Sequence, residues 1–276
     1  MSKYPVDIES IYNDFIESKN EENRAERYKG NEHWYHASAI GLCSRRLYYE
    51  SIEKVKPTNK ADKRSMRIMR LGSVVHEDIQ EALSIYNNIN TSINTNRDTS
   101  INTNIDTNKK KKLIIEKKKN NINFHIEKEI TLPTLNVRGF YDMVAEIEAD
   151  GVFLYDIKTI GSYPWKIKFG KNAQAEPNNN HFLQLGTYGL AVKKHFGQLD
   201  GMYMLYYNKD SSRLKQVVVP MTYLGMAESY WININKEHQE GLPQFNLGTS
   251  PYKAWVCDYC QFKDHCDSPF GKQGRK

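Results

Sequence analysis

Long apolar segments are absent from this chain of 276 residues. It has no run of about 18 apolar residues, the length that a membrane-spanning helix needs. The first residues, MSKYPVDIESIYNDF, also lack the apolar core of a signal peptide, so we expect an intracellular, cytoplasmic protein with no membrane partner. A strong charge imbalance is missing too, since the net charge is only +6. This charge permits nucleic-acid binding without requiring it.

Cysteine is scarce, with four residues in the whole chain. In an intracellular protein, so few cysteines favour metal ligands, reactive thiols or buried fillers over disulfides. What is present is ordinary for a globular protein: 39% hydrophobic and 26% charged residues. The length allows one large domain or a core with a smaller appended unit.

Hydrophobic periodicity and turn residues predict an alternation of helices and strands. The expected helices cover 6–29, 38–52 (with Ser38 as its N-cap), 63–86, 179–195 and 222–240, and the expected strands cover 122–132, the hairpin 137–159, 201–208 and 214–220. Residues 160–180 are expected to form a loop. Mixed patterns of this kind are typical of an α/β fold.

One segment looks unlike the rest. Thr91–Asp98 (TSINTNRD) is followed by Thr99–Asp106 (TSINTNID), a nearly perfect duplication rich in Asn and Thr. A segment with only isolated Ile and without aromatic residues cannot bury enough surface to order itself. We therefore expect residues 87–120, including the lysine runs that follow the duplication, to be a disordered low-complexity insertion in a surface loop.

The predicted hairpin over residues 137–159 carries three ionisable groups among apolar neighbours: Asp142, Asp156 and Lys158. Strand side chains alternate between faces, so Asp156 and Lys158 point the same way. Carboxylates suit Mg²⁺ or Mn²⁺, and a nearby lysine can orient a water molecule or stabilise the transition state of phosphodiester hydrolysis. The alternative for this pattern is an exposed strand with a weak surface ion pair.

The turn decides whether the first carboxylate joins the other two groups. A three-residue loop over 149–151, with its glycine in the left-handed position, would pair Glu148 with Val152 and place Asp142 opposite Lys158. A two-residue loop would shift the register by one residue and move Asp142 to the other face. The three-residue turn is the favoured interpretation.

Motifs on both sides of the hairpin follow the order of a known nuclease group. His76 ends the sequence LGSVVH in a predicted helix, Gly139–Asp142 reads GFYD, Asp156–Lys158 reads DIK, and Gln184 and Tyr188 share a later helix. This order and spacing resembles the PD-(D/E)xK nuclease superfamily and, more narrowly, its RecB-like exonuclease branch.

The resemblance implies a role for each residue. The implied metal ligands are His76, Asp142, Asp156 and the carbonyl oxygen of Ile157. Lys158 would be the catalytic lysine, Gln184 would position the lysine or the nucleophile, and Tyr188, one turn further on the same helix face, would touch the substrate. Taken singly, His76 also fits a buried helix histidine, and the Gln–Tyr pair fits a polar seam at the edge of a core.

The cysteines form a second pattern. Cys257, Cys260 and Cys266 are spaced C-x-x-C-x5-C, and Cys43 stands alone far upstream, whereas a zinc ribbon would offer two C-x-x-C pairs. One cysteine before the nuclease motifs and three after them resembles the iron–sulfur exonucleases of the CRISPR-associated RecB-like and AddB-type families. That resemblance implies a 4Fe–4S cluster held by the four thiolates. A zinc ion, or four unrelated buried thiols, remain as alternatives.

We therefore expect an α/β fold with a restriction-endonuclease-like core, a small mixed sheet flanked by helices, over residues 61–240. Residues 1–60 and 241–276 would form a helical unit that holds the iron–sulfur cluster. Candidate phosphate contacts and base-stacking residues are Arg45, Arg46, Lys166, Lys168, Lys171, Tyr163 and Trp165.

The expected activity is Mg²⁺- or Mn²⁺-dependent exonuclease digestion of single-stranded DNA in recombination, repair or CRISPR adaptation. Its partners would be DNA and proteins of those processes. One alternative is a non-catalytic DNA-end-binding or scaffold protein that keeps a structural metal cluster. Another is a nuclease stapled by zinc that acts on duplex ends.

Overall fold

The structure is a computed structural model that describes residues 7–27, 33–94, 121–171, 179–244 and 254–266. It divides into two compact units, each considered by itself below. The first unit comprises Met1–Tyr35, Leu42–Val74 and Ile234–Lys276, and the second comprises His36–Gly41 and Val75–Asn233. No helix among the described residues combines the length and the apolar character that crossing a membrane requires.

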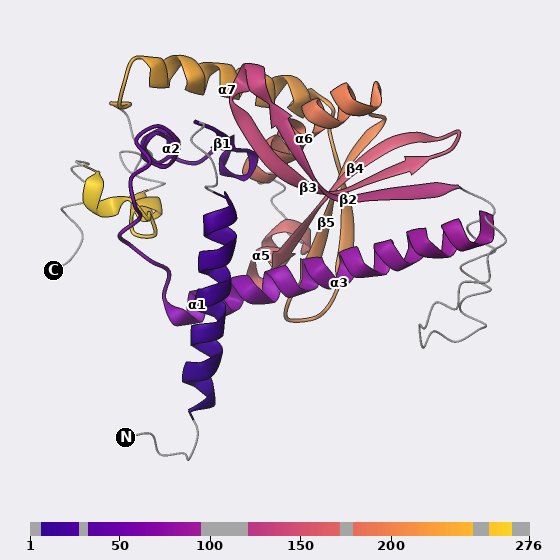
Figure 1. The fold of residues 1–276 in the computed structure, drawn as a ribbon, viewed down its shortest axis with the longest axis horizontal. Coiled ribbons are helices and arrows are strands. Elements are labelled where there is room, and N and C mark those ends of the chain that lie inside the picture. Colours follow the sequence, from indigo (N-terminus) through magenta and orange to yellow (C-terminus); the bar gives the residue numbers. More distant parts are fainter. Residues whose placement is uncertain (1–6, 28–32, 95–120, 172–178, 245–253, 267–276) are drawn as a thin grey trace. The chain divides into compact units, whose positions relative to one another are not determined.

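A mixed six-stranded sheet forms the centre of the second unit (Figure 1). Its strands are β1 (Tyr35–His36), β2 (Ile122–Leu132), β3 (Val137–Ile147), β4 (Gly151–Ile160), β5 (Gly201–Asn208) and β6 (Leu214–Val219). The order is β1-β3-β4-β5-β6, and β2 also pairs with β3. The β4–β5 pair is parallel, whereas β2–β3, β3–β4 and β5–β6 are antiparallel. The predicted small mixed sheet is confirmed.

The hairpin turn between β3 and β4 has three residues, as predicted, but lies one residue earlier, at 148–150. Ile147 pairs with Gly151 across it. Ala149, rather than a glycine, takes the left-handed conformation, with φ of 73°. Gly151 begins β4 with φ of 119°, and a Cβ there would strike the carboxylate of Asp200, so the glycine is needed on the strand side of the turn.

This shift corrects the predicted register. Glu148, expected opposite Val152, lies in the loop instead. Each residue of β3 is thus paired with a β4 residue two positions earlier than predicted. Because side chains alternate between the two faces of a sheet, a shift by an even number of residues leaves each side chain on its predicted face. Continuing the observed register beyond its last pair brings Asp142 opposite Asp156, not opposite Lys158 as predicted.

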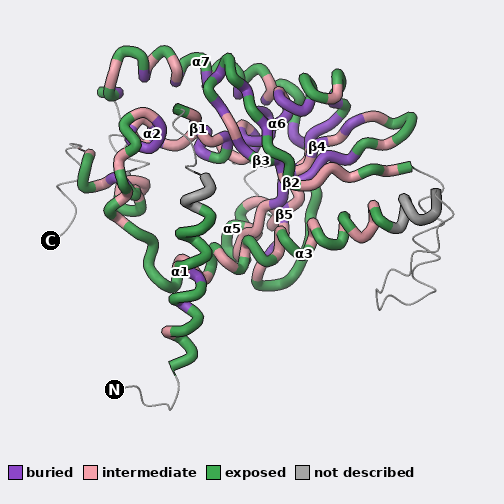
Figure 2. Tube along the Cα trace, in the orientation of Figure 1, coloured by how far each residue is buried: buried purple, intermediate pink, exposed green. Residues whose placement is uncertain are grey.

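Helices accompany the sheet of the second unit. They are the later part of α3 (Lys63–Asn94), α5 (Ser162–Phe169), α6 (Asn179–Phe196) and most of α7 (Thr222–Gln239). Buried residues, purple in Figure 2, lie on the strands and on α6 and α7. Those whose side chains are fully buried include Leu154, Ile157, Met202, Leu185 and Trp231. The indole nitrogen of Trp231 donates a hydrogen bond of 2.9 Å to the hydroxyl of Thr187, which ties α7 to α6.

Two predictions for this unit are wrong: a helix lies within a predicted loop, and another helix extends beyond its predicted end. The predicted loop 160–180 contains the helix α5, which Gly161 precedes and Gly170 follows. The expected helix 63–86 continues as α3 to Asn94, so the first residues of the expected insertion are helical. The rest of the insertion, from residue 95 to 120, lies outside the described residues.

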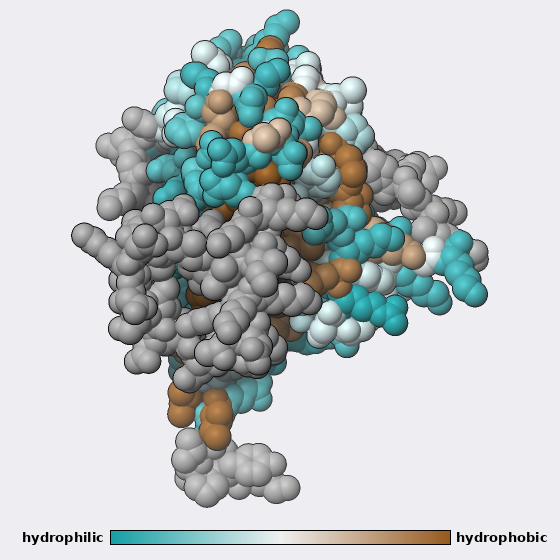
Figure 3. All heavy atoms as spheres, turned by 90° about the vertical axis from the view of Figure 1, so that its right-hand side faces the viewer, coloured by the Kyte–Doolittle hydropathy of each residue, from teal (hydrophilic) through white to brown (hydrophobic). Residues whose placement is uncertain are grey.

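The first unit contains α1 (Ile8–Arg27), α2 (Ser44–Ser51), the start of α3, the end of α7 and two short 3-10 helices, η4 (Ala254–Cys257) and η5 (Lys263–His265). The predicted helix from Ser38 to Ile52 is wrong at its start. Residues Ala37–Ala39 form a separate 3-10 helix, and Gly41, with φ of 74°, breaks the chain before α2 begins at Ser44. The first turns of α1 leave the side chains of Ile8, Ile11, Tyr12 and Phe15 exposed. Figure 3 shows a small group of hydrophobic residues, in brown, at the surface of its lower end.

The C-terminal tail packs on α2 and on the segment that follows it. Phe262 is 1% exposed and its ring lies 6.1 Å from that of Tyr49, whose hydroxyl donates to the carbonyl of His265 at 3.0 Å. The backbone N–H of Thr58 and the side chain of Asn59 bond the carbonyl oxygens of Gln261 and Cys260, respectively, at 3.1 Å each. These contacts hold the tail cysteines close to the chain around α2.

Candidate active site

The site lies where β3 and β4 separate. The last pair of their ladder is Met143 with Tyr155, so Asp142 and Asp156 stand just beyond it. The carboxylate of Asp142 accepts a hydrogen bond of 2.6 Å from the backbone N–H of Ile157. The backbone of β4 therefore fixes the first carboxylate beside the second.

Asp156 is the most buried charged group of the site, with 1% of its surface exposed. Its Oδ2 lies 2.7 Å from the ammonium of Lys158, and its Oδ1 accepts a hydrogen bond of 3.4 Å from the amide of Gln184. Burial raises the pKa of Asp156 to about 6, and the charge of Asp142 adds to that rise, whereas Lys158 and His76 oppose it. A carboxylate in this setting is stabilised by any further cation that reaches it.

His76 approaches the site from α3. Its Nδ1 lies 3.5 Å from Oδ1 of Asp142, and Gln80, one turn further along the helix, lies at 3.5 Å from the backbone carbonyl of Asp142. Side-chain exposures of 25% for His76 and 19% for Asp142 leave this side of the site open to solvent. The open side offers an entry path for an ion and a phosphate.

The side chains and the backbone carbonyl at this site are of the types that bind a divalent ion. Two carboxylates, an imidazole and a strand carbonyl are the ligand types that Mg²⁺ and Mn²⁺ accept. The N–H and C=O of one strand residue point to the same side, so the carbonyl of Ile157 is directed toward Asp142, as its N–H is. Among the described residues, however, no three His, Cys, Asp or Glu side chains already form a metal-binding group.

The helix α6 covers the buried carboxylate. The amide of Gln184 donates to the hydroxyl of Tyr188 at 3.0 Å as well as to Asp156. The ring of Tyr188 lies against β3 at Gly139, where a Cβ would come within 3.0 Å of both that ring and the Cβ of Ala37. The glycine of the GFYD motif thus makes room for the tyrosine of α6.

Two residues beside the lysine were missed by the sequence reasoning. Tyr206 lies directly opposite Lys158 in the parallel β4–β5 ladder and is 1% exposed. His181 precedes Gln184 by one helical turn, and burial, followed by the charges of Lys158 and Lys168, lowers its pKa to about 3. The spacing of His181, Gln184 and Tyr188 at i, i+3 and i+7 would have signalled one polar helix face. No sequence signal marks Tyr206, because its position depends on the pairing of two distant strands.

The four cysteines are free thiols of the first unit. Burial raises the pKa of Cys257, and the thiols of Cys43, Cys260 and Cys266 raise it further, so the four groups lie within electrostatic reach of one another. Burial likewise raises the pKa of Cys260. In the part of the chain that the structure describes, these thiols do not form a metal site.

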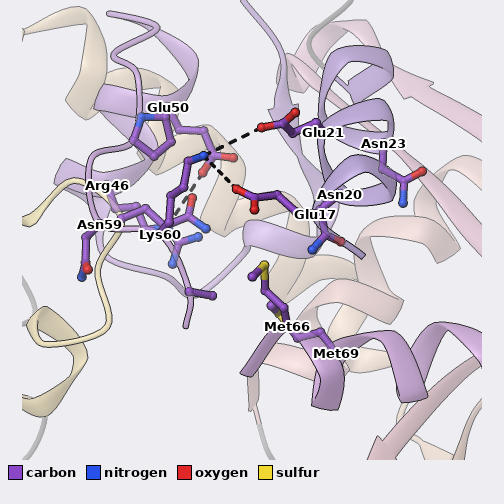
Figure 4. Close-up of a pocket in the computed structure, with 13 residues that line it drawn as sticks. Glu17, Asn20, Glu21, Asn23, Arg46, Glu50, Asn59, Lys60, Met66 and Met69 are labelled. Carbon is purple, nitrogen blue, oxygen red and sulfur yellow. Dashed lines mark hydrogen bonds and ion pairs between the residues drawn. The ribbon is translucent and has the colours of Figure 1, made fainter. Parts of the chain in front are cut away.

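The first unit also contains a cavity of about 340 Å³, lined by α1, α2, the segment after α2 and the start of α3 (Figure 4). Lys60 reaches into it and lies 3.4 Å from Glu17 and 3.8 Å from Glu21. Surface pairs of this kind contribute little free energy. In this cavity the paired charges of Lys60, Glu17 and Glu21 are accessible to solvent, whereas the carboxylate of Asp156 at the hairpin is buried.

Comparison with models of known protein families identifies the superfamily of this chain. The PD-(D/E)XK nuclease superfamily matches residues 36–267, most of the chain and all of the hairpin site. The chain belongs to that superfamily. Its members are nucleases that typically use divalent metals such as Mg²⁺, in agreement with the donor set at the hairpin. Among curated protein sequences, none matches this chain.

Solved structures show more distant similarity. The crystal structure of SSO0001 has 16% sequence identity and a TM-score of 0.48, covering 93% of this chain and 96% of that one. An alkaline exonuclease (LHK-Exo) from Laribacter hongkongensis has 14% identity and a TM-score of 0.35, covering 76% of this chain and 90% of its own. The assignment to the PD-(D/E)XK superfamily rests on the family match, not on these two structures.

Proposed function

We propose that this PD-(D/E)XK protein is a metal-dependent exonuclease of the RecB-like branch that digests single-stranded DNA. The observation that carries the proposal is the buried Asp156, paired with Lys158 and next to Asp142 at the point where two strands separate. A structural protein gains little from an ionised carboxylate buried at this point, because its desolvation is costly. A nuclease requires such a group.

His76, Asp142, Asp156 and the carbonyl oxygen of Ile157 would hold the metal ion. A bound Mg²⁺ or Mn²⁺ would lower the pKa of a water molecule and shield the charge of the phosphate. The protein's own part is to fix the carboxylates before the ion arrives, through the Ile157 N–H bond to Asp142 and the Gln184 bond to Asp156. Groups fixed in advance need no reorganisation during the reaction.

Lys158 would act on the phosphate. Its ammonium carries three donors and is 20% exposed at the edge of the site, so it can orient the attacking water or stabilise the charge that develops on the phosphate oxygens. Gln184 would hold Asp156 in its orientation, and Tyr188 would support Gln184 while its ring packs on Gly139.

The substrate and role follow from the proposed branch. Exposed aromatic and basic side chains on α5, such as Tyr163 and Lys166, are suited to stacking on unpaired bases and to binding phosphates. Recombination, repair and CRISPR adaptation are the processes in which such an activity would serve, with proteins of those processes as partners.

We also propose that Cys43, Cys257, Cys260 and Cys266 hold a 4Fe–4S cluster in the first unit. The support is their spacing and the effect of neighbouring thiols in raising the pKa of Cys257 and Cys260. Cluster binding would have to remove protons from thiols whose pKa is raised by burial, a cost that iron–thiolate bonding repays. Iron and sulfide analysis of anaerobically purified protein, with its visible absorption, distinguishes this cluster from zinc, which gives no such band.

The competing function is a DNA-end-binding or scaffold protein that cleaves nothing. The test is digestion of single-stranded and duplex DNA, labelled at the 5′ or the 3′ end, with Mn²⁺, Mg²⁺ or EDTA. The proposal predicts release of short products from single strands with either metal and none in EDTA. DNA binding without any cleavage in Mn²⁺ would favour a non-catalytic DNA-end-binding or scaffold protein. Preferential digestion of duplex ends would favour the zinc-containing nuclease that acts on duplex DNA.

A further inference from the structure

Apart from Oδ2 of Asp156, which forms the ion pair with Lys158, two buried polar atoms near the hairpin site have no hydrogen-bond partner among the described residues: the hydroxyl oxygen of Tyr206 and Nδ1 of His181. A buried polar group left without a partner loses its hydrogen bonds to water without replacement, so such groups in a native protein call for an explanation. The two residues come from different elements, β5 and α6, yet their rings lie 6.5 Å apart.

The lysine is the common neighbour of both. Tyr206 is the direct β5 partner of Lys158, and side chains paired in this way emerge on the same face of a sheet. His181 lies close enough to Lys158 for the charge of the ammonium to act on its ring. Because His181 is held neutral, one of its ring nitrogens carries a lone pair and can accept a hydrogen bond.

Lys158 needs a second set of acceptors if the site binds a metal. Its ammonium is 2.7 Å from Oδ2 of Asp156, the carboxylate that the proposed function gives to the ion. An ammonium has three donors and no acceptor capacity, so it can move only toward oxygen or nitrogen lone pairs. The NH2 group of Gln184, which donates to Asp156 and Tyr188, is itself a donor and cannot accept from the ammonium.

We propose that Tyr206 and His181 are positioning residues that hold the ammonium of Lys158 when Asp156 binds the metal ion. Resting on the proposed nuclease function, this assigns two further residues to the site. The phenol oxygen and Nδ1 of the imidazole accept from the lysine, which stays beside the phosphate instead of competing with the ion for Asp156. Phe169, 5.3 Å from the ring of Tyr206, and the ammonium of Lys168, 5.5 Å from it, keep that ring in place.

The test uses Tyr206→Phe, which removes only the hydroxyl, and His181→Ala with His181→Asn as the conservative variant that restores an acceptor. Tyr203→Phe is the matched control, because Tyr203 is on the same strand, and its ring stacks on Tyr155 at 4.9 Å instead of lying beside Lys158. Mn²⁺ affinity is measured by titration calorimetry without DNA, and kcat and KM are measured on single-stranded DNA.

We expect Tyr206→Phe and His181→Ala to weaken Mn²⁺ binding and to lower kcat by roughly tenfold each, the effect of one lost hydrogen bond, with KM unchanged. His181→Asn should recover most of the loss, and Tyr203→Phe should match the wild type. In a Lys158→Met background, which has no ammonium to relocate, Tyr206→Phe should leave Mn²⁺ affinity unchanged.

Unchanged Mn²⁺ affinity and kcat in Tyr206→Phe would overturn the inference, and so would an equal loss of affinity in the presence and absence of Lys158. Far-ultraviolet circular dichroism and unfolding midpoints of each variant show whether it is folded, and Tyr206→Phe serves as the deciding variant if His181→Ala is not. An Asp156→Ala protein that still cleaves DNA would instead refute the proposed function, so the two failures are distinguishable.

Discussion

The hairpin site and the cysteine region organise their reactive groups in opposite ways. At the hairpin, strand register sets Asp142 beside Asp156, and hydrogen bonds from the backbone of Ile157 and the side chain of Gln184 hold the two carboxylates. In the first unit, four thiols lie near one another but do not form a metal site within the described residues. Backbone pairing can prearrange ligands on a strand, whereas ligands on loops and short turns depend on the metal to gather them.

The largest effect expected from this contrast is on catalysis. Lys158→Met should lower the rate of single-strand digestion by roughly 10³-fold, because one donor to the developing charge is lost, while DNA binding in Ca²⁺ remains. Lys193→Met, at an exposed position on α6, should stay within about twofold of the wild type as a generic effect of one lost surface charge. Similar losses in both variants would show that the hairpin lysine contributes only general charge.

The cysteine region should respond mainly in stability. Cys266→Ser is expected to lower the free energy of unfolding by roughly 3 kcal/mol or more and to abolish iron binding, because metal binding contributes directly to folding. His265→Ala next to it should change stability little, since its side chain is exposed and only its backbone carbonyl holds Tyr49. Equal midpoints for Cys266→Ser and His265→Ala in thermal unfolding would contradict a structural cluster.

The ionised carboxylate of Asp156 should lower the stability of the folded protein, whereas the cysteine region should raise it. Burial raises the pKa of Asp156 to about 6, above its unfolded value of about 3.8, so the folded protein loses stability as the pH rises through 6. Asp156→Asn, which resembles the protonated acid, should therefore stabilise the metal-free protein at pH 8 by roughly 2 kcal/mol. The gain should vanish near pH 3, below the pKa of the unfolded carboxyl, where Asp156 is protonated in both the folded and the unfolded wild type, and urea unfolding in EDTA at the two pH values measures it. A variant less stable than the wild type at pH 8 would refute this reading of the site.

The smallest expected effect is at the contact between β3 and α6. Gly139→Ala would place a Cβ within 3.0 Å of the ring of Tyr188, at a cost of roughly 1–2 kcal/mol of stability. A displaced Tyr188 would also loosen Gln184, so we expect a severalfold loss of kcat with a smaller change in KM. Full activity in this variant would show that α6 covers Asp156 without positioning it.

The hairpin was accessible from sequence because strand alternation and turn length are local. The prediction placed the turn one residue late, since Ala149 takes the left-handed position that was assigned to the glycine. The error did not separate the carboxylates, because the resulting change of pairing was even. Strand alternation is robust to such a shift, whereas the identity of the residue opposite Asp142 is not.

Other features depended on distant parts of the chain. Tyr206 reaches Lys158 only through the pairing of β4 with β5, two strands separated in sequence by α5 and α6. The helix α5 was predicted as a loop because Pro164 and its flanking glycines resemble turn signals, although a proline within the first turn of a helix is well tolerated. The arrangement of the thiols could not be predicted either, since spacing identifies candidate ligands without fixing their distances.

The most direct test of the account is the rate of phosphodiester hydrolysis by Asp156→Asn in Mn²⁺, measured with end-labelled single-stranded DNA. Asp150→Asn, at the exposed turn of the same hairpin, is the matched control. The account predicts that Asp156→Asn loses at least about 10³-fold in rate while it still binds DNA, and that Asp150→Asn cleaves like the wild type. Hydrolysis by Asp156→Asn at the wild-type rate would contradict the account.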